Sequence, residues 1–170
     1  GKVNDRVFIN VAAGGMFTEI AHTVPTKQKT VMGKLAYYLE GMREFTSTMG
    51  EKKGFHLKVK NDEVDMEVKA LFFIIANSTS VGGFKNIAPY AEVHDGVFDV
   101  MIVEEMNLPD LMELLADIRR GEHTENKRIK YFKTDWLELT SDVDINIDVD
   151  GEKEGKLPVV VEVIKNAISI

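Results

Sequence analysis

The chain has 170 residues, a formal net charge of −7 and 44% hydrophobic residues, which is the composition of an ordinary folded domain. It contains no cysteine, which excludes disulfide bonds and cysteine-ligated zinc sites. The net acidity argues against a nucleic-acid-binding protein, because such proteins normally carry a basic surface. The longest apolar run, residues 70–76, is much shorter than the roughly 20 residues of a membrane-spanning helix. We therefore expect a soluble, cytoplasmic protein with one domain over residues 1–170.

Strand-like and helix-like periods alternate through the first half of the chain. Residues 7–11 form a short apolar run that ends at a pair of glycines, which predicts a buried strand. Residues 27–45 carry apolar side chains at the spacing of an amphipathic helix. Apolar and polar residues then alternate over 55–60 and 64–68, on either side of a polar turn, which predicts a hairpin with one solvated face. Residues 71–75 are apolar on both faces and predict a central strand.

The second half of the chain contains one more helix among further strands. Asn107 can cap this helix, Pro109 suits its first turn, and Gly121 suits its C-terminal end. Strands are predicted for residues 97–103, 136–140, 145–149, 159–164 and 167–170. Two amphipathic helices inserted among many antiparallel-type strands predict an α+β domain that is mostly β.

A polar, glycine-containing loop over residues 77–84 follows the most buried predicted strand. Such a loop can present backbone N–H groups to an anion or a substrate. It can equally be a plain connection, because glycine marks turns generally. The loop lacks the Gly-Lys-Ser/Thr ending of a Walker A motif, so it is not a nucleotide loop of that kind.

Acidic residues beside glycine occur at two further places. Asp95 is followed by Gly96 before a predicted strand, where its carboxylate could close a tight turn or hold a hard cation such as Mg²⁺. Asp148, Asp150 and Glu152 alternate and would share one face of an extended strand. Crowded carboxylates raise at least one pKa, which suits a general base. An Asp-Gly pair between strands is also the strongest short hairpin signal, and on the residues alone we favour the turn in both places.

Three segments taken in order resemble one known family. They are residues 8–17; residues 73–96, which contain Ala-Asn-Ser, Gly-Gly-Phe, Ala-Pro-Tyr-Ala and Asp-Gly; and residues 149–158, which contain Asp-Gly-Glu followed by Gly-Lys-Leu-Pro. In this order and spacing they resemble the C-terminal half of the bacterial soluble diacylglycerol kinases, which are lipid kinases related to sphingosine kinases. Residues 120–124 are similar to the same family. The resemblance covers essentially the whole chain.

This resemblance implies that the chain is the second domain of a two-domain protein. The family's ATP-binding Gly-Gly-Asp-Gly-Thr motif lies in an N-terminal nucleotide-binding domain, and the motif is absent from this sequence. The family's C-terminal domain is β-sandwich-like and contributes to the lipid site. The resemblance therefore implies an antiparallel, β-sandwich-like domain into which the two predicted helices are inserted.

The resemblance also implies roles for individual residues. By position, Glu152 matches the family's proton acceptor, with Asp150 beside it. Asp95 matches the side-chain ligand of a structural Mg²⁺, and Glu92 and Val97 match positions that supply backbone carbonyls to that ion. With the resemblance included, we favour a functional role over a plain turn for Asp95 and Glu152.

The activity implied for the intact protein is transfer of the γ-phosphoryl group of ATP to the hydroxyl of diacylglycerol, which gives phosphatidic acid. ATP and its Mg²⁺ would be bound mainly by the N-terminal domain, so the chain alone is expected to be inactive. The partners implied are the lipid substrate, the protein's own N-terminal domain and the inner membrane surface, contacted peripherally, although anionic lipid repels a net charge of −7. A homodimer is left open.

Two alternatives remain open at this point. The chain could be a lipid-binding module without catalysis, because it shows no ATP site of its own. It could also belong to a kinase of the same superfamily that acts on another acceptor, such as a sphingoid base, another lipid alcohol or NAD. The choice of acceptor depends on the shape of the site.

Overall fold

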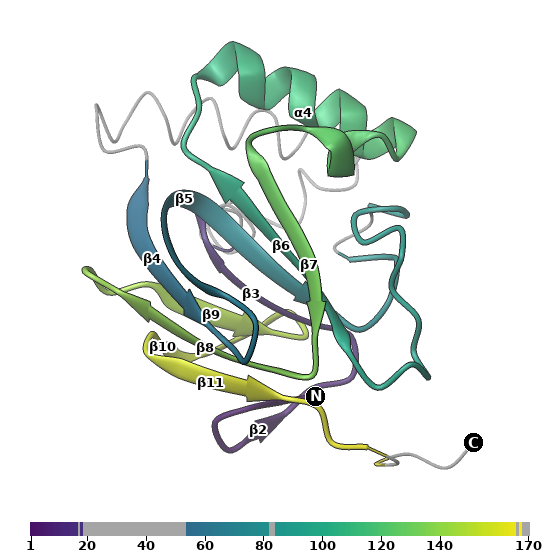
Figure 1. Cartoon of the computed structure of the whole chain (residues 1–170), viewed down its shortest axis with the longest axis vertical. Coiled ribbons are helices and arrows are strands. Elements are labelled where there is room, and N and C mark those ends of the chain that lie inside the picture. Colours follow the sequence, from purple (N-terminus) through teal and green to yellow (C-terminus); the bar gives the residue numbers. More distant parts are fainter. Residues whose placement is uncertain (17, 19–53, 82–83, 166, 168–170) are drawn as a thin grey trace.

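The computed structural model describes residues 1–16, 18, 54–81, 84–165 and 167 (Figure 1). The first seven strands are β1 (Lys2–Val3), β2 (Arg6–Val7), β3 (Val11–Gly15), β4 (Phe55–Lys60), β5 (Asp65–Ala76), β6 (Phe98–Glu104) and β7 (Ile129–Thr134). The remaining strands are β8 (Trp136–Ser141), β9 (Asn146–Val149), β10 (Glu152–Lys156) and β11 (Val159–Glu162). Helix α4 (Leu108–Arg120) and the short 3-10 helix η1 (His123–Glu125) connect β6 to β7.

The described strands form one antiparallel sheet that branches at β5. Its main path runs β10-β9-β3-β5-β4-β8-β11-β1-β2, while β6 pairs with β5 and carries β7 on its other edge. Figure 1 shows that the sheet curls into a sandwich-like arrangement. Buried apolar side chains from β4, β5, β6, β8, β9 and β11 form a core within it. The prediction of a mostly β, antiparallel domain is therefore confirmed.

Strand β5 lies between two apolar cores. Its first five residues alternate between exposed and half-buried, and its last seven are buried. Leu71 and Phe72 are neighbours in the chain yet lie in the same core, which we call the helix-side core. They do so because the register against β6 shifts at this point, as in a β-bulge. Ala70, Phe73 and Ile75 lie in the other core, which we call the sheet-side core.

Helix α4 covers the helix-side core, and its ends are those that the sequence predicts. The Asn107 side chain accepts a hydrogen bond from the backbone N–H of Asp110 at 2.8 Å, and Gly121 ends the helix in the left-handed conformation at φ 78°. The buried stripe of the helix consists of Leu111, Leu114, Leu115 and Ile118. Within the part of the chain that the structure describes, no helix is both long and apolar enough to cross a bilayer.

The His123 ring on η1 is completely buried. Its Nε2 lies 2.9 Å from the carbonyl oxygen of Ile87. Because a carbonyl can only accept, Nε2 carries the proton and donates it, while Nδ1 has no hydrogen-bond partner. Burial lowers the pKa of His123, so the ring is neutral near pH 7. A neutral imidazole therefore links η1 to Ile87, which precedes the loop that contains Asp95.

The β4–β5 hairpin confirms one of the clearest sequence predictions. Its turn is closed by Asn61, whose side-chain oxygen accepts the backbone N–H groups of Glu63 at 2.8 Å and Val64 at 2.6 Å. The strands predicted separately at 64–68 and 71–75 are one continuous strand, because the bulge changes the burial pattern without ending the hydrogen-bond ladder.

Other predictions differ from the structure or lie outside its described residues. The strand predicted at 7–11 is interrupted: Val7 belongs to β2, and β3 begins only at Val11. Between them the backbone N–H groups of Ile9 and Asn10 donate to the Asp150 side chain rather than to a neighbouring strand. Strands β1, β7 and β10 were not predicted. The helix predicted at 27–45 lies outside the described residues, as does nearly all of the strand predicted at 167–170.

Candidate functional site

Three loops meet at the ends of strands β3, β5 and β9. Strand β3 begins where β5 and β9 end, because Val11 pairs with Ala76 and Ala12 pairs with Val149. The loop that precedes β3 and the loops that follow β5 and β9 therefore lie together (Figure 1). These loops contain parts of the three segments that the sequence singles out, so residues far apart in the chain form one polar cluster.

Asp150 is the centre of this cluster. Its Oδ1 accepts hydrogen bonds from the backbone N–H groups of Asn10 and Val11, both at 2.9 Å, and its Oδ2 accepts one from Ile9 at 2.8 Å. Asp150 and Gly151 both have positive φ, 51° and 94°, which is the backbone of a type I′ hairpin turn. The predicted Asp-Gly turn is present, and its carboxylate fixes the loop before β3.

The alternation of acids around this turn does not place three carboxylates on one face, because the chain reverses direction there. Asp148 is buried on β9, and its Oδ1 accepts the backbone N–H of Gly151 at 2.7 Å. Glu152 begins β10 on the other side of the turn and is exposed. The turn therefore separates the acids into two that bind backbone groups and one that faces solvent.

Amide and hydroxyl side chains tie the loop after β5 to the loop before β3. The backbone N–H of Asn77 donates to the Asn10 carbonyl at 2.9 Å, and the Asn77 side chain donates to the Ile9 carbonyl at 3.0 Å. The Ser78 hydroxyl donates to the Asn10 side-chain oxygen, and the Asn10 amide donates to the Ser80 carbonyl at 3.4 Å. These bonds hold the loop in place, while its contact with an anion or a substrate stays a prediction.

Glu152 is an exposed acid of this region whose carboxylate accepts no backbone hydrogen bond from the described residues. Its side chain is 72% exposed, and its Oε2 lies 3.0 Å from Nη2 of Arg6. Arg6 also lies 3.4 Å, through Nε, from Oε1 of Glu154, the next residue but one on the same edge strand. Glu152 therefore presents an accessible carboxylate, which can accept a proton from an alcohol, next to a guanidinium that can bind anionic oxygens.

The structure gathers the predicted ligand residues on one short loop. The backbone N–H of Asp95 donates to the Glu92 carbonyl at 3.4 Å, and the N–H of Val97 donates to Asp95 Oδ1 at 3.1 Å. The Lys133 ammonium donates to Asp95 Oδ2 at 2.8 Å and to the Tyr90 carbonyl at 2.6 Å. Both oxygens of the Asp95 carboxylate therefore already accept hydrogen bonds.

A second carboxylate, Asp99, lies on the buried side of Lys133. Asp99 is 1% exposed, and the Tyr131 hydroxyl donates to its Oδ1 at 2.5 Å. Its Oδ2 has no hydrogen-bond partner and lies 3.5 Å from Lys133 Nζ, within ion-pair distance. Burial raises the pKa of the Asp99 carboxyl, and the hydrogen bond to Asp95 raises the pKa of Lys133. Lys133 is therefore positively charged and compensates a buried acid.

The oxygens around Lys133 suit a cation, because carboxylates and carbonyls are what Mg²⁺ prefers. The positive charge that they surround is, however, the ammonium of Lys133. A metal ion on Asp95 would have to share its carboxylate with that ammonium, so the arrangement does not fit Mg²⁺ while Lys133 stays in place. Over the described ranges, no group of three or more His, Cys, Asp or Glu side chains could hold a metal. The ligand roles of Asp95, Glu92 and Val97 stay predictions.

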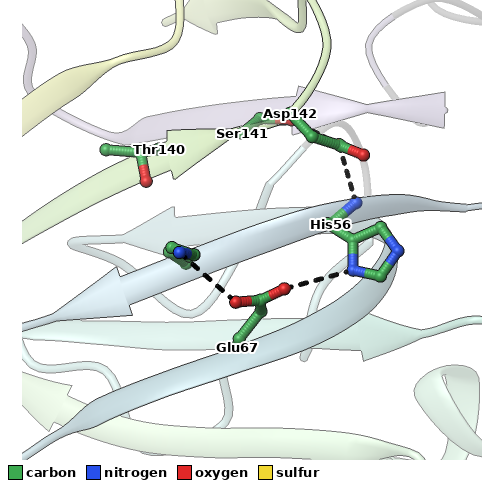
Figure 2. Close-up of a pocket in the computed structure, with 6 residues that line it drawn as sticks. His56, Glu67, Thr140, Ser141 and Asp142 are labelled. Carbon is green, nitrogen blue, oxygen red and sulfur yellow. Dashed lines mark hydrogen bonds and ion pairs between the residues drawn. The ribbon is translucent and has the colours of Figure 1, made fainter.

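A shallow hollow elsewhere on the sheet is not a candidate site for a lipid. It has a volume of about 470 Å³ on the solvent-facing side of β4, β5 and β8, and it is lined by His56, Lys58, Glu67, Thr140, Ser141 and Asp142. Figure 2 shows the His56 ring facing Glu67, with Nδ1 3.3 Å from the carboxylate, and the His56 backbone N–H donating to Asp142. Its polar lining offers no apolar wall for an acyl chain.

Three residues of these clusters were missed by the sequence reasoning. Asp99 and Lys133 face each other directly across the β6–β7 pair. Residues 129–134 contain Ile, Tyr and Phe, which favour a strand, but apolar and polar residues do not alternate strictly there, so the sequence does not show which residue faces Asp99. Arg6 gives no comparable signal, because nothing in the sequence around it indicates a partner at Glu152.

The chain is similar to a known family of domains and to diacylglycerol kinases of two organisms. It matches the family model described as the YegS C-terminal NAD kinase β-sandwich-like domain over residues 10–170. It is 35% identical to a diacylglycerol kinase of Staphylococcus saprophyticus over 158 residues, which cover 93% of this chain and 50% of that protein. For a diacylglycerol kinase of Staphylococcus aureus (strain JH9) the identity is 36%, with 93% and 49% covered.

The solved structures that resemble the chain share its fold. A crystal structure of a diacylglycerol kinase from Bacillus anthracis strain Sterne matches with a TM-score of 0.69 at 21% identity, covering 96% of this chain and 52% of that one. A second structure from the same organism gives a TM-score of 0.74 at 22% identity. The chain spans about half the length of the curated relatives it matches.

Proposed function

Because the chain belongs to the family of YegS C-terminal NAD kinase β-sandwich-like domains, we propose that it forms the C-terminal half of an ATP-dependent lipid kinase that converts diacylglycerol to phosphatidic acid. The observation that carries this proposal is the position of Glu152, a solvent-facing carboxylate near the strand ends where three loops meet. The names of the curated relatives support the choice of diacylglycerol as acceptor.

In the proposed reaction the substrate hydroxyl attacks the γ-phosphorus of ATP, and the bond from that phosphorus to the β,γ-bridging oxygen breaks, which releases ADP. The hydroxyl proton passes to the carboxylate of Glu152. Phosphoryl transfer depends mainly on positioning and on neutralising charge, and a carboxylate that accepts the hydroxyl proton is a recurring part of such sites. Arg6 is close enough to Glu152 to place positive charge beside the reacting oxygens.

Asp150 has a different part in this proposal. Its two oxygens already accept three backbone N–H groups, so it is a poor candidate for accepting a substrate proton. We assign it as a positioning residue that fixes the loop before β3 and the turn from which Glu152 emerges. ATP would bind to the half of the protein that this chain does not span, and a bilayer-embedded acceptor would bring the protein to the membrane surface.

The first test replaces Glu152 with Gln in the full-length protein. General-base catalysis typically contributes about 10²- to 10⁴-fold, so we expect kcat for ATP-dependent phosphorylation of diacylglycerol in detergent micelles to fall at least about 100-fold. Circular dichroism and urea unfolding should match the parent protein, because an exposed ion pair contributes only about 0–1 kcal/mol.

Glu154→Gln is the matched control, because Glu154 is on the same strand and contacts the same Arg6. Its kcat should stay within about threefold of the parent, since a surface carboxylate without a proton to accept has little effect. Near-normal turnover in Glu152→Gln, or equal losses in both variants, would contradict the base assignment. A panel with a sphingoid base and NAD as acceptors would show whether diacylglycerol is the preferred substrate.

A further inference from the structure

The ammonium of Lys133 occupies a site built from three oxygens of residues 90–99. Its Nζ lies 2.6 Å from the Tyr90 carbonyl, 2.8 Å from Asp95 Oδ2 and 3.5 Å from Asp99 Oδ2. Tyr90 and Asp95 are on the loop before β6, Asp99 is on β6, and Lys133 is on β7. The lysine therefore connects this loop to the sheet beneath it.

The register of the sheet places Lys133 there. Asp99 and Lys133 are directly opposite each other in the β6–β7 pair, and side chains that are opposite in a pair lie on the same face. Tyr131, two residues earlier on β7, is on that face as well and holds the first oxygen of Asp99. The Tyr131 ring also packs edge-on against Tyr90, with ring centroids 5.7 Å apart.

Two carboxylates and a carbonyl converge on this point, and one of the carboxylates is buried. A buried carboxylate needs a hydrogen bond or an opposite charge, and Asp99 Oδ2 has no hydrogen-bond donor. Among the described residues, Lys133 is the positively charged side chain within ion-pair distance of this oxygen. The two acids thus favour a cation beside them, and strand β7 supplies one.

We propose that Lys133 is the resident cation of the Asp95 loop, and that the loop is held in place without a divalent metal ion. Its two short contacts, at 2.6 and 2.8 Å, are close to the about 2.7–2.9 Å of charge-assisted N–H···O bonds, whereas Mg²⁺ holds its oxygens at about 2.1 Å in a near-octahedral set. A Mg²⁺ ion on Asp95 would be repelled by the ammonium and would have to displace it. Lys133 therefore does in this chain what the family resemblance assigns to the metal.

The experiment is amide hydrogen exchange of residues 85–97 in the full-length protein without nucleotide, with EDTA or with millimolar MgCl₂ at matched ionic strength. In the parent protein we expect the same exchange rates in both buffers. In Lys133→Met these amides should exchange at least about tenfold faster in EDTA, because the loop has lost its link to β7.

Lys130→Met is the control, because Lys130 is on the same strand and pairs with Glu104 at 3.0 Å, away from the loop. Its loop exchange should equal that of the parent. Faster loop exchange of the parent protein in EDTA, reversed by Mg²⁺ and abolished by Asp95→Asn, would overturn the proposal. Unchanged exchange rates of residues 85–97 in Lys133→Met would also overturn it. The parent comparison needs no variant, so a Lys133 variant that fails to fold leaves the test decisive, and catalytic activity is not its readout.

Discussion

Removing the Asp150 carboxylate tests whether this residue positions the loops of the candidate site. In Asp150→Ala the backbone N–H groups of Ile9, Asn10 and Val11 lose their acceptor. The Ile9 and Asn10 bonds are exposed and water replaces most of their strength, whereas the Val11 bond is partly buried and costs about 1.5 kcal/mol. Alanine also pays about 1 kcal/mol at φ 51°.

Together these effects predict that Asp150→Ala lowers the free energy of unfolding by about 3 kcal/mol. Asp150→Asn should lose only about 1 kcal/mol, because its remaining carbonyl oxygen can serve Asn10 and Val11 and because asparagine tolerates positive φ. Urea unfolding measures both values. Hydrogen exchange at Ile9, Asn10 and Val11 should accelerate in the same order, with Ala above Asn.

Asp144→Asn is a suitable control, since Asp144 is 79% exposed and forms a surface ion pair with Lys156. It should change the free energy of unfolding by less than about 0.5 kcal/mol. Asp150 does not position this loop if the Asp150→Ala free energy of unfolding is within about 0.5 kcal/mol of the parent value and the three amides keep their exchange rates. In that case the hydrogen bonds to Asp150 contribute nothing that water cannot supply.

Two further predictions concern Gly15 and His123. Gly15→Ala should lower the free energy of unfolding in urea by more than about 2 kcal/mol, because Gly15 has φ 92° and a Cβ there would lie 2.6 Å from the Leu71 carbonyl oxygen. Gly155→Ala is the control and should cost only about 1 kcal/mol, because Gly155 has φ 86° but no atom within 4 Å of an added Cβ. Equal losses in the two variants would contradict the role of the close contact. His123 has a lowered pKa in the folded state, so the unfolded state binds more protons below its ordinary pKa of about 6.5 and stability falls as the pH drops through that value. His123→Gln, which can keep the bond to Ile87, should lose less stability than the parent between about pH 7 and pH 5, and identical pH profiles would count against the assignment.

The sequence predicted those parts of the fold that depend on local patterns. The β4–β5 hairpin follows from strict alternation around Asn61, and the ends of α4 follow from Asn107 and Gly121. Strand β10 could not be predicted in this way, because residues 152–156 are polar on both faces and are held at the edge of the sheet by β9 alone. Hydrophobic periodicity carries no signal for such a strand.

The site was predicted in outline only. The segments that contain Asn10, Asn77 and Asp150 were singled out, and the structure brings them together. Their contacts could not be derived from the sequence, because the bonds of Asp150 cross about 140 positions of the chain and depend on the register of β3 against β9. Lys133 was missed for the same reason. The catalytic role of Glu152 stays a prediction.

Strand β5 contributes side chains to both the helix-side core and the sheet-side core, so the two cores share one strand. Moving Phe72 in the helix-side core also moves Phe73, its neighbour in the sheet-side core. Loss of packing in one core should therefore disturb packing in the other. We expect the described sheet to unfold in a single cooperative step. The loop that begins at Asn77 continues directly from this strand, so it is anchored by the stability of the whole domain.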